Sequence, residues 1–327
     1  MKYDGIVDLN NRNSSQVFAG EMIGGNKRVL EFGCASGYVS RVLRDRGCKV
    51  VGIEIDAEFA SQAKEFCEDV IIGNAEELDL ESILTERSFD VAVFGDVLEH
   101  MSDPLGMLRR VRQWLVPDGY VVASLPNIAH GAVRLALLDG RFDYTPEGLL
   151  DETHLRFFTH DTIKDLFHQA GFVLVETQRT HVGIFESEIS LRREDYDPEV
   201  VARIEADHDA STYQFVVKAL VDNALSAAEV VHEREEAQRI EILDLQAELD
   251  RAQAEVTSLR AALETSETDR VDAQETLERL RQEVSALRTD LAAREDAVAN
   301  YEAFMARLEG RSAVRFYRSL KRFISGS

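Results

Sequence analysis

The chain has 327 residues, of which 30% are charged, and its formal net charge is −23. An acidic chain lacks the basic surface that nonspecific binding to nucleic acid requires, so we predict no nucleic-acid partner. The first residues lack the apolar run of a signal peptide, no stretch reaches the roughly 20 apolar residues of a membrane span, and the three cysteines form no C-x-x-C pair, so we expect a cytosolic protein without disulfides or structural zinc.

Up to about residue 222, short β-rich runs alternate with amphipathic helical segments, which is typical of a parallel sheet covered on both faces. Seven strands are predicted, at 28–32, 49–53, 70–72, 89–94, 120–125, 172–178 and 212–220. Helices are predicted between them, at 38–46, 57–68, 105–114 and 159–170. The fold class is therefore α/β, in one domain over residues 1–222.

A second part of different composition follows, because glycine and proline almost vanish from about residue 230. Counting by sevens from Ile242 and from Leu245 gives two mainly apolar series without interruption, as at the a and d positions of a coiled coil. We predict a connector over 223–240 and a long α-helical coiled coil over 241–309. Valines at a and leucines at d favour a parallel homodimer; the weak middle leaves a trimer open, and a solitary helix is the alternative.

The first chemical motif is Val-Leu-Glu-Phe-Gly-Cys-Ala-Ser-Gly at 29–37, a strand that runs into a glycine turn and then a helix. Glycines let the backbone approach a ligand, and the helix start offers free N–H groups. A dinucleotide site favours G-x-G-x-x-G, and Ala35 breaks that pattern. Glu54 ends the next strand, about twenty residues later, where a carboxylate can bind both hydroxyls of a ribose.

Further motifs follow in order: Gly-Asn-Ala-Glu-Glu at 73–77, Phe-Asp-Val-Ala-Val-Phe-Gly-Asp-Val-Leu-Glu-His-Met at 89–101, and Leu-Val-Pro-Asp-Gly-Tyr-Val-Val-Ala-Ser at 115–124. Together the series resembles the successive motifs of class I S-adenosylmethionine-dependent methyltransferases, over about residues 25–220. The resemblance implies a Rossmann-like seven-stranded domain with S-adenosylmethionine as its cofactor.

The resemblance also implies which residues contact the cofactor. The methionine end would lie against Glu31, Gly33, Cys34 and Gly37, the ribose on Glu54, the adenine against Asn74 and Ala75, and Asp96 would form the wall beside the ligand. The chain departs from the family pattern at Ala35, Asn74 and Asp118, where glycine, aspartate and glycine are common. These departures weaken single contacts and leave the cofactor assignment in place.

The acceptor is expected to meet the insertion at 126–159, which is rich in His, Asp, Arg, Tyr and Phe and leaves the edge of the sheet where ligands bind. His130 and His154 are the catalytic candidates, because a hydroxyl needs a base and histidine titrates near neutrality. Asp151 would orient a histidine or bind the acceptor. Tyr144 and Arg156 would line the acceptor pocket.

The alternative interpretation is that His154 and Arg156 have a structural role and only hold the insertion against the core. His100 is expected to be structural, and no ligand spacing predicts a metal site.

The stretch 140–159 looks like that of bacterial methyltransferases found with surface-polysaccharide synthesis, and loosely like ubiquinone O-methyltransferases. A methyltransferase domain followed by a coiled coil also resembles the chain-terminating enzymes of O-antigen synthesis. The resemblance favours O-methylation of a glycan or glycolipid hydroxyl, with a glycosyltransferase as partner. The alternatives are methylation of a quinone-like or other small metabolite, and a non-catalytic scaffold with a vestigial methyltransferase fold.

The last segment, 310–327, reads as a basic amphipathic tail. Arginines at 311, 315, 318 and 322 fall on one helical face and apolar residues on the other. Such a helix suits peripheral contact with an anionic membrane at the inner face, or with a partner protein.

Overall fold

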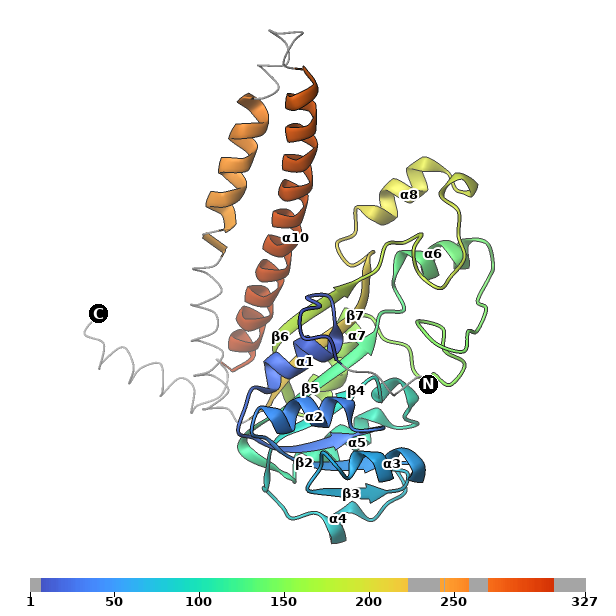
Figure 1. The fold of residues 1–327 in the computed structure, drawn as a ribbon, viewed down its shortest axis with the longest axis vertical. Coiled ribbons are helices and arrows are strands. Elements are labelled where there is room, and N and C mark those ends of the chain that lie inside the picture. The colour runs from blue at the N-terminus through green and yellow to red at the C-terminus, as the bar shows by residue number, and fades with distance from the viewer. Residues whose placement is uncertain (1–6, 223–241, 244, 259–269, 309–327) are drawn as a thin grey trace, which may run out of the picture. The chain divides into compact units, whose positions relative to one another are not determined.

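The computed structural model describes residues 7–222, 242–243, 245–258 and 270–308 (Figure 1). Contacts divide the chain into two units, Met1–Asn223 and Ala224–Ser327. The first unit carries the sheet and all the candidate site residues.

The first unit is built on one seven-stranded sheet with the order β3-β2-β1-β4-β5-β7-β6. Its strands are β1 (Arg28–Phe32), β2 (Lys49–Glu54), β3 (Asp69–Ile72), β4 (Phe89–Gly95), β5 (Leu115–Pro126), β6 (Phe172–His181) and β7 (Thr212–Val221). All seven predicted strands are present, and the Rossmann-like α/β class is confirmed.

The direction of the last strand departs from the prediction of a parallel sheet. β1 to β5 run parallel, whereas β7 is antiparallel to both β5 and β6, so the sheet is mixed. β7 returns from β6 and fills the position between β5 and β6. An apolar run indicates that a strand is buried, but it does not indicate the direction of the strand. The sequence pattern therefore could not predict that β7 is antiparallel.

Short helices connect the strands. They are α1 (Ser15–Ile23), α2 (Tyr38–Asp45), α3 (Ala57–Ala63), α4 (Leu80–Ile83), α5 (Pro104–Val111), α6 (Gly131–Leu138), α7 (His160–Gln169) and α8 (Pro198–Glu205), with 3₁₀ turns η1 (Leu98–His100) and η2 (Arg193–Asp195). The four predicted helices correspond to α2, α3, α5 and α7. The sequence analysis did not predict α1, α4, α6 and α8. In α1 and α6, apolar or small residues occupy most positions, so the amphipathic periodicity that marks a surface helix is weak.

The main hydrophobic core lies between the sheet and the helices α5 and α7. Phe32 on β1 and Phe94 on β4 stack with their ring centroids 4.4 Å apart, and Trp114 is almost fully buried in the same core cluster. In Figure 1, α1 and α2 lie in front of the sheet, and α1 contacts both α2 and β5. This packing fixes the carboxyl ends of β1, β2, β4 and β5 at one edge.

The insertion leaves this edge after β5 and returns to it. An isolated parallel bridge joins Asn127 to Phe158, so the two ends of the insertion lie side by side. Thr159 then caps α7 in a capping box with Thr162. The loop before α7 is thereby held against the ends of the strands.

The second unit is helical over 242–243 and 245–258 and in α10 (Arg270–Leu308). Leu277 and Leu280, which the heptad pattern places at a and d, are buried, whereas Glu278 and Arg279 between them are exposed. The coiled-coil pairing and the oligomer number stay predictions. The tail at 310–327 and the connector at 223–240 lie outside the described residues. Among the residues that are described, no helix has the length and apolar character to cross a bilayer.

Candidate functional site

The turn after β1 has backbone φ angles that residues other than glycine rarely adopt. Gly33, Ala35 and Gly37 have φ angles of 64°, 46° and 82°, all in the left-handed region. A Cβ on Gly33 would lie 2.7 Å from Val97 Cγ2, and a Cβ on Gly37 would lie 2.9 Å from the α-carbon of Ala63. The glycines are therefore required by close approach of the protein itself. Ala35 adopts the same region at a cost of about 1–2 kcal/mol.

Glu54 at the end of β2 is held by two backbone donors. The amide of Ala35 donates to Glu54 Oε2 at 2.8 Å, and the amide of Asp56 donates to Oε1 at 2.9 Å. The residue is 6% exposed. A carboxylate has about four acceptor positions, so one remains on each oxygen for an incoming hydroxyl. Two fixed oxygens with free acceptor positions suit a vicinal diol.

Glu31 lies in β1, below the turn, and is buried. The hydroxyl of Ser40 donates to its Oε2 at 2.5 Å. Burial raises the pKa of Glu31 to about 8, although the bond from Ser40 opposes this rise. Cys34 is also buried, in an apolar cluster with Ala60, so only its backbone faces the turn.

Asn74 and Ala75 follow β3 and are half-buried. Asn74 Oδ1 accepts from the amide of Glu76 at 3.0 Å, and its Nδ2 donates to Glu77 Oε1 at 3.1 Å. Glu76 in turn accepts from the amides of residues 102 and 103. The loop after β3 is thus tied to the segment that follows η1.

Asp96 brings three strands together at the rim. Its Oδ1 accepts from Ser124 Oγ at 2.9 Å and from Gln214 Nε2 at 2.7 Å, which join the ends of β4, β5 and β7. Burial raises the pKa of Asp96, and the bonds from Ser124 and Gln214 and the nearby His100 oppose the rise. Its φ of 55° bends the chain away from β4 into η1.

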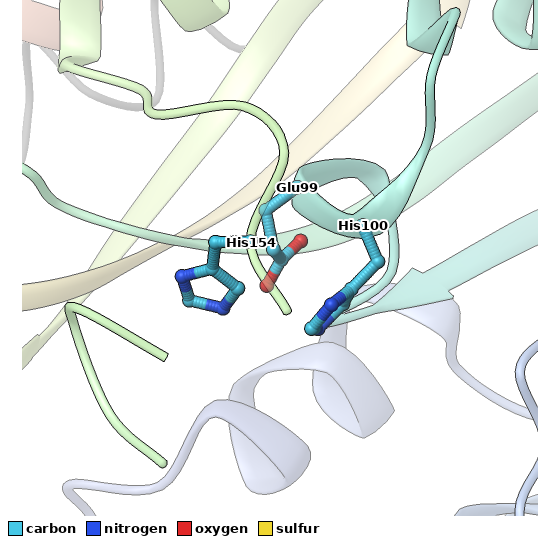
Figure 2. A group of neighbouring side chains, drawn as sticks. All are labelled: Glu99, His100 and His154. Carbon is cyan, nitrogen blue, oxygen red and sulfur yellow. The ribbon is translucent and has the colours of Figure 1, made fainter. Parts of the chain in front are cut away.

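The insertion docks on η1. The amides of Leu155 and Arg156 donate to the carbonyl of Glu99 at 2.8 and 2.9 Å. This contact places His154 beside Glu99 and His100, and one ligand atom from each of the three lies within 4.8 Å of the others (Figure 2). The rings of His100 and His154 meet edge to face with centroids 4.8 Å apart. The sequence analysis predicted no role for Glu99 and a structural role for His100.

Asp151 acts on this cluster through Thr153. Its Oδ1 accepts from the amide and the hydroxyl of Thr153 at 2.8 and 2.6 Å. The Nδ1 atom of His100 lies 3.2 Å from the Thr153 carbonyl oxygen and 3.1 Å from its hydroxyl oxygen. Asp151 therefore supports the residue that orients His100.

The side chains of the other three candidates are not part of this cluster. His130 is fully buried at the start of α6, where Nδ1 accepts from the amide of Ala132 and Nε2 bonds the carbonyl of Val182. Tyr144 is 58% exposed, with its ring against Phe142. Arg156 donates to the carbonyl of residue 102. His130 has both ring nitrogens engaged within the protein, and Arg156 does tie the insertion to the segment after η1.

A family model described as a methyltransferase domain matches residues 11–177. Among curated relatives, the ubiquinone biosynthesis O-methyltransferase of Ruegeria pomeroyi is 29% identical over 157 residues, which cover 46% of this chain and 61% of that protein. The protein of the same name from Aeromonas salmonicida is 24% identical over 174 residues, covering 50% and 71%. The chain thus spans about three fifths of the length of the Ruegeria relative.

Solved structures resemble the first unit at low sequence identity. A methyltransferase from Thermotoga maritima, described as a possible histamine N-methyltransferase, is 20% identical, with a TM-score of 0.45 over 63% of this chain and 87% of that one. One from Archaeoglobus fulgidus is 18% identical, with a TM-score of 0.45 over 65% and 97%.

Proposed function

This chain belongs to the family of methyltransferase domains and is an S-adenosylmethionine-dependent enzyme, and we propose that it methylates a hydroxyl of a small, quinone-like metabolite. The observation that carries the acceptor class is the set of curated relatives, which are named ubiquinone biosynthesis O-methyltransferase at 24–30% identity. The sequence alone favoured a glycan hydroxyl. The names of the relatives support the small-metabolite alternative instead.

The residues at the rim fit S-adenosylmethionine. Glu54 keeps one acceptor position on each oxygen for the two ribose hydroxyls, because its backbone bonds use only one position on each. Glu31 lies below the turn, where an ionised carboxylate would pair with the ammonium of the methionine end. When bound, the cofactor supplies a methyl group on a positively charged sulfur, and it leaves as S-adenosylhomocysteine.

Asp96 borders the same rim and is fixed by Ser124 and Gln214. Its position at the end of β4 supports the proposed place beside the cofactor. Val97 packs against Gly33, so the turn that would hold the methionine end and the segment that carries Glu99 are in contact. The cofactor and acceptor halves of the proposed site therefore adjoin.

An acceptor hydroxyl is a weak nucleophile until its proton leaves. The groups at the rim that can promote this loss are His100, His154 and Glu99, with Asp151 supporting them through Thr153. As the proton departs, the acceptor oxygen would take the methyl group that bound S-adenosylmethionine supplies, and the electron pair of the broken carbon–sulfur bond would stay on sulfur. His130 has no part in this step because its ring is fully buried and engaged.

The experiment is a transfer assay with methyl-labelled S-adenosylmethionine and two acceptor fractions from cells, the extractable small molecules and the purified envelope glycans. Label is expected in an aromatic hydroxy compound of the first fraction. Incorporation into saccharide alone would overturn the proposed acceptor class. No transfer to either fraction, together with no binding of S-adenosylhomocysteine, would support the vestigial scaffold.

A further inference from the structure

Glu99, His100 and His154 form a compact group of metal-binding side chains. Figure 2 shows the carboxylate of Glu99 between the two imidazole rings. The first two come from η1 and the third from the insertion loop, which the bonds to the Glu99 carbonyl hold in place. Two imidazole nitrogens and one carboxylate oxygen form a ligand set that divalent transition metals bind well in proteins.

The carboxylate of Glu99 is buried without the partners it needs. The residue is 1% exposed, and its Oε2 has no hydrogen-bond donor among the described residues. Among the described residues, no lysine or arginine forms an ion pair with the carboxylate of Glu99. A buried acceptor of this kind is costly and rare, so it points to a partner of positive charge.

His100 is already oriented as a ligand would be. Its Nδ1 faces the carbonyl oxygen of Thr153 at 3.2 Å, and the hydroxyl of Thr153 donates to Asp151. A proton on Nδ1 that is donated to this carbonyl leaves the lone pair on Nε2. Metal-binding histidines typically carry this kind of bond on their other nitrogen, which fixes the ring and its tautomer.

We propose that Glu99, His100 and His154 bind one divalent transition-metal cation. Two atoms bonded to one such ion at about 2.0–2.1 Å lie about 3.0–3.4 Å apart. One ligand atom from each of the three side chains lies within 4.8 Å of the others. Side-chain rotations that bring the widest pair of these atoms about 1.5 Å closer would therefore allow all three to bind one ion.

The role of the ion rests on the proposed function. Three protein ligands leave coordination positions open, which water or an acceptor oxygen can take. A coordinated hydroxyl loses its proton to solvent more readily, because the ion stabilises the resulting oxyanion. That oxygen would then take the methyl group, and the bond between the methyl carbon and sulfur would break. The histidines serve as ligands in this state, and no side chain has to accept the proton.

The test uses the full-length, tag-free protein after removal of metals with a chelator. It is titrated with Co²⁺, and binding is followed by visible absorption and by calorimetry. One ion per chain is expected. Glu99→Gln and His100→Ala are expected to weaken binding at least about tenfold, since even partners outside the coordination shell cost about 10–100-fold. His168→Ala removes an exposed histidine of α7 outside the cluster and should leave the affinity unchanged.

Thermal unfolding of the metal-free protein separates a ligand from a structural residue. Glu99→Gln keeps the shape of the side chain and replaces a buried carboxyl group whose Oε2 has no hydrogen-bond partner among the described residues, so the unfolding midpoint should stay the same or rise. A lower midpoint with unchanged Co²⁺ affinity would show that Glu99 is structural and would overturn the proposal. Methyl transfer without any Co²⁺ binding would overturn the cation site alone. Co²⁺ binding without methyl transfer would support the site and count against the proposed function.

Discussion

Replacing Glu54 with glutamine changes one charge at the proposed ribose site and keeps the shape of the side chain. The carboxylate accepts one backbone amide on each oxygen and has one further acceptor position on each. Glutamine keeps a single oxygen and turns its amide nitrogen toward a backbone donor. A hydrogen bond to a charged group contributes about 1.5–3 kcal/mol. The affinity for S-adenosylhomocysteine should therefore fall about ten- to 150-fold.

Glu76→Gln is the matched control, measured by the same calorimetric titration. Glu76 also accepts two backbone amides, those of Ser102 and Asp103 at 3.0 and 2.8 Å, and the cofactor assignment does not include it. Both variants should lose similar stability, about 1–3 kcal/mol, because each places an amide against a backbone donor. Equal affinities of Glu54→Gln and the unmodified protein would refute the ribose assignment, as would an equal loss in Glu76→Gln.

Three further substitutions test other parts of the site. Gly33→Ala should lower the unfolding midpoint and the affinity for S-adenosylhomocysteine, because its Cβ would lie 2.7 Å from Val97 Cγ2. Gly24→Ala also places a Cβ at a positive φ, of 77°, but in open space, so an equal loss of affinity in both variants would contradict this. His130→Ala should lower the free energy of unfolding by about 2–4 kcal/mol, because it leaves two buried backbone groups unpaired. The folded fraction should keep its turnover. A loss of turnover without a loss of stability would instead indicate a catalytic role for His130. The pKa of Glu31 is raised to about 8 in the folded state, so stability should fall as pH rises from about 4.5 to 8, by up to about 1.4 kcal/mol per unit. Denaturant unfolding across this range should show that slope in the unmodified protein and a smaller one in Glu31→Gln.

The strands and the cofactor rim could be predicted because their signals are local. A strand that ends in Glu54 about twenty residues after a glycine turn places the carboxylate beside that turn through parallel register, as Glu31↔Gly52 and Phe32↔Ile53 show. The apolar runs also located all seven strands. They could not give the direction of β7, because burial is the same for either direction.

The acceptor side depends on contacts between distant segments. Asp96 bonds Gln214, 118 residues away, and His100 meets Thr153, 53 residues away. The periodicity of apolar residues along the sequence does not indicate contacts between such distant residues. His130 shows the same difficulty in reverse, since the sequence shows a histidine in a polar insertion and hides its complete burial. Glu99 could have been singled out from the sequence, because it lies four residues after a buried strand and directly precedes a histidine, and a carboxylate does not contribute to apolar packing.

The most direct measurement is a structure of the protein crystallised with S-adenosylhomocysteine. We expect both ribose hydroxyls to donate to the carboxylate of Glu54 and the sulfur to lie between the turn at Gly33 and Asp96. We also expect Glu99, His100 and His154 to lie on the side of the sulfur where the methyl group would point. A ligand whose ribose avoids Glu54, or whose sulfur is turned away from that cluster, would contradict it.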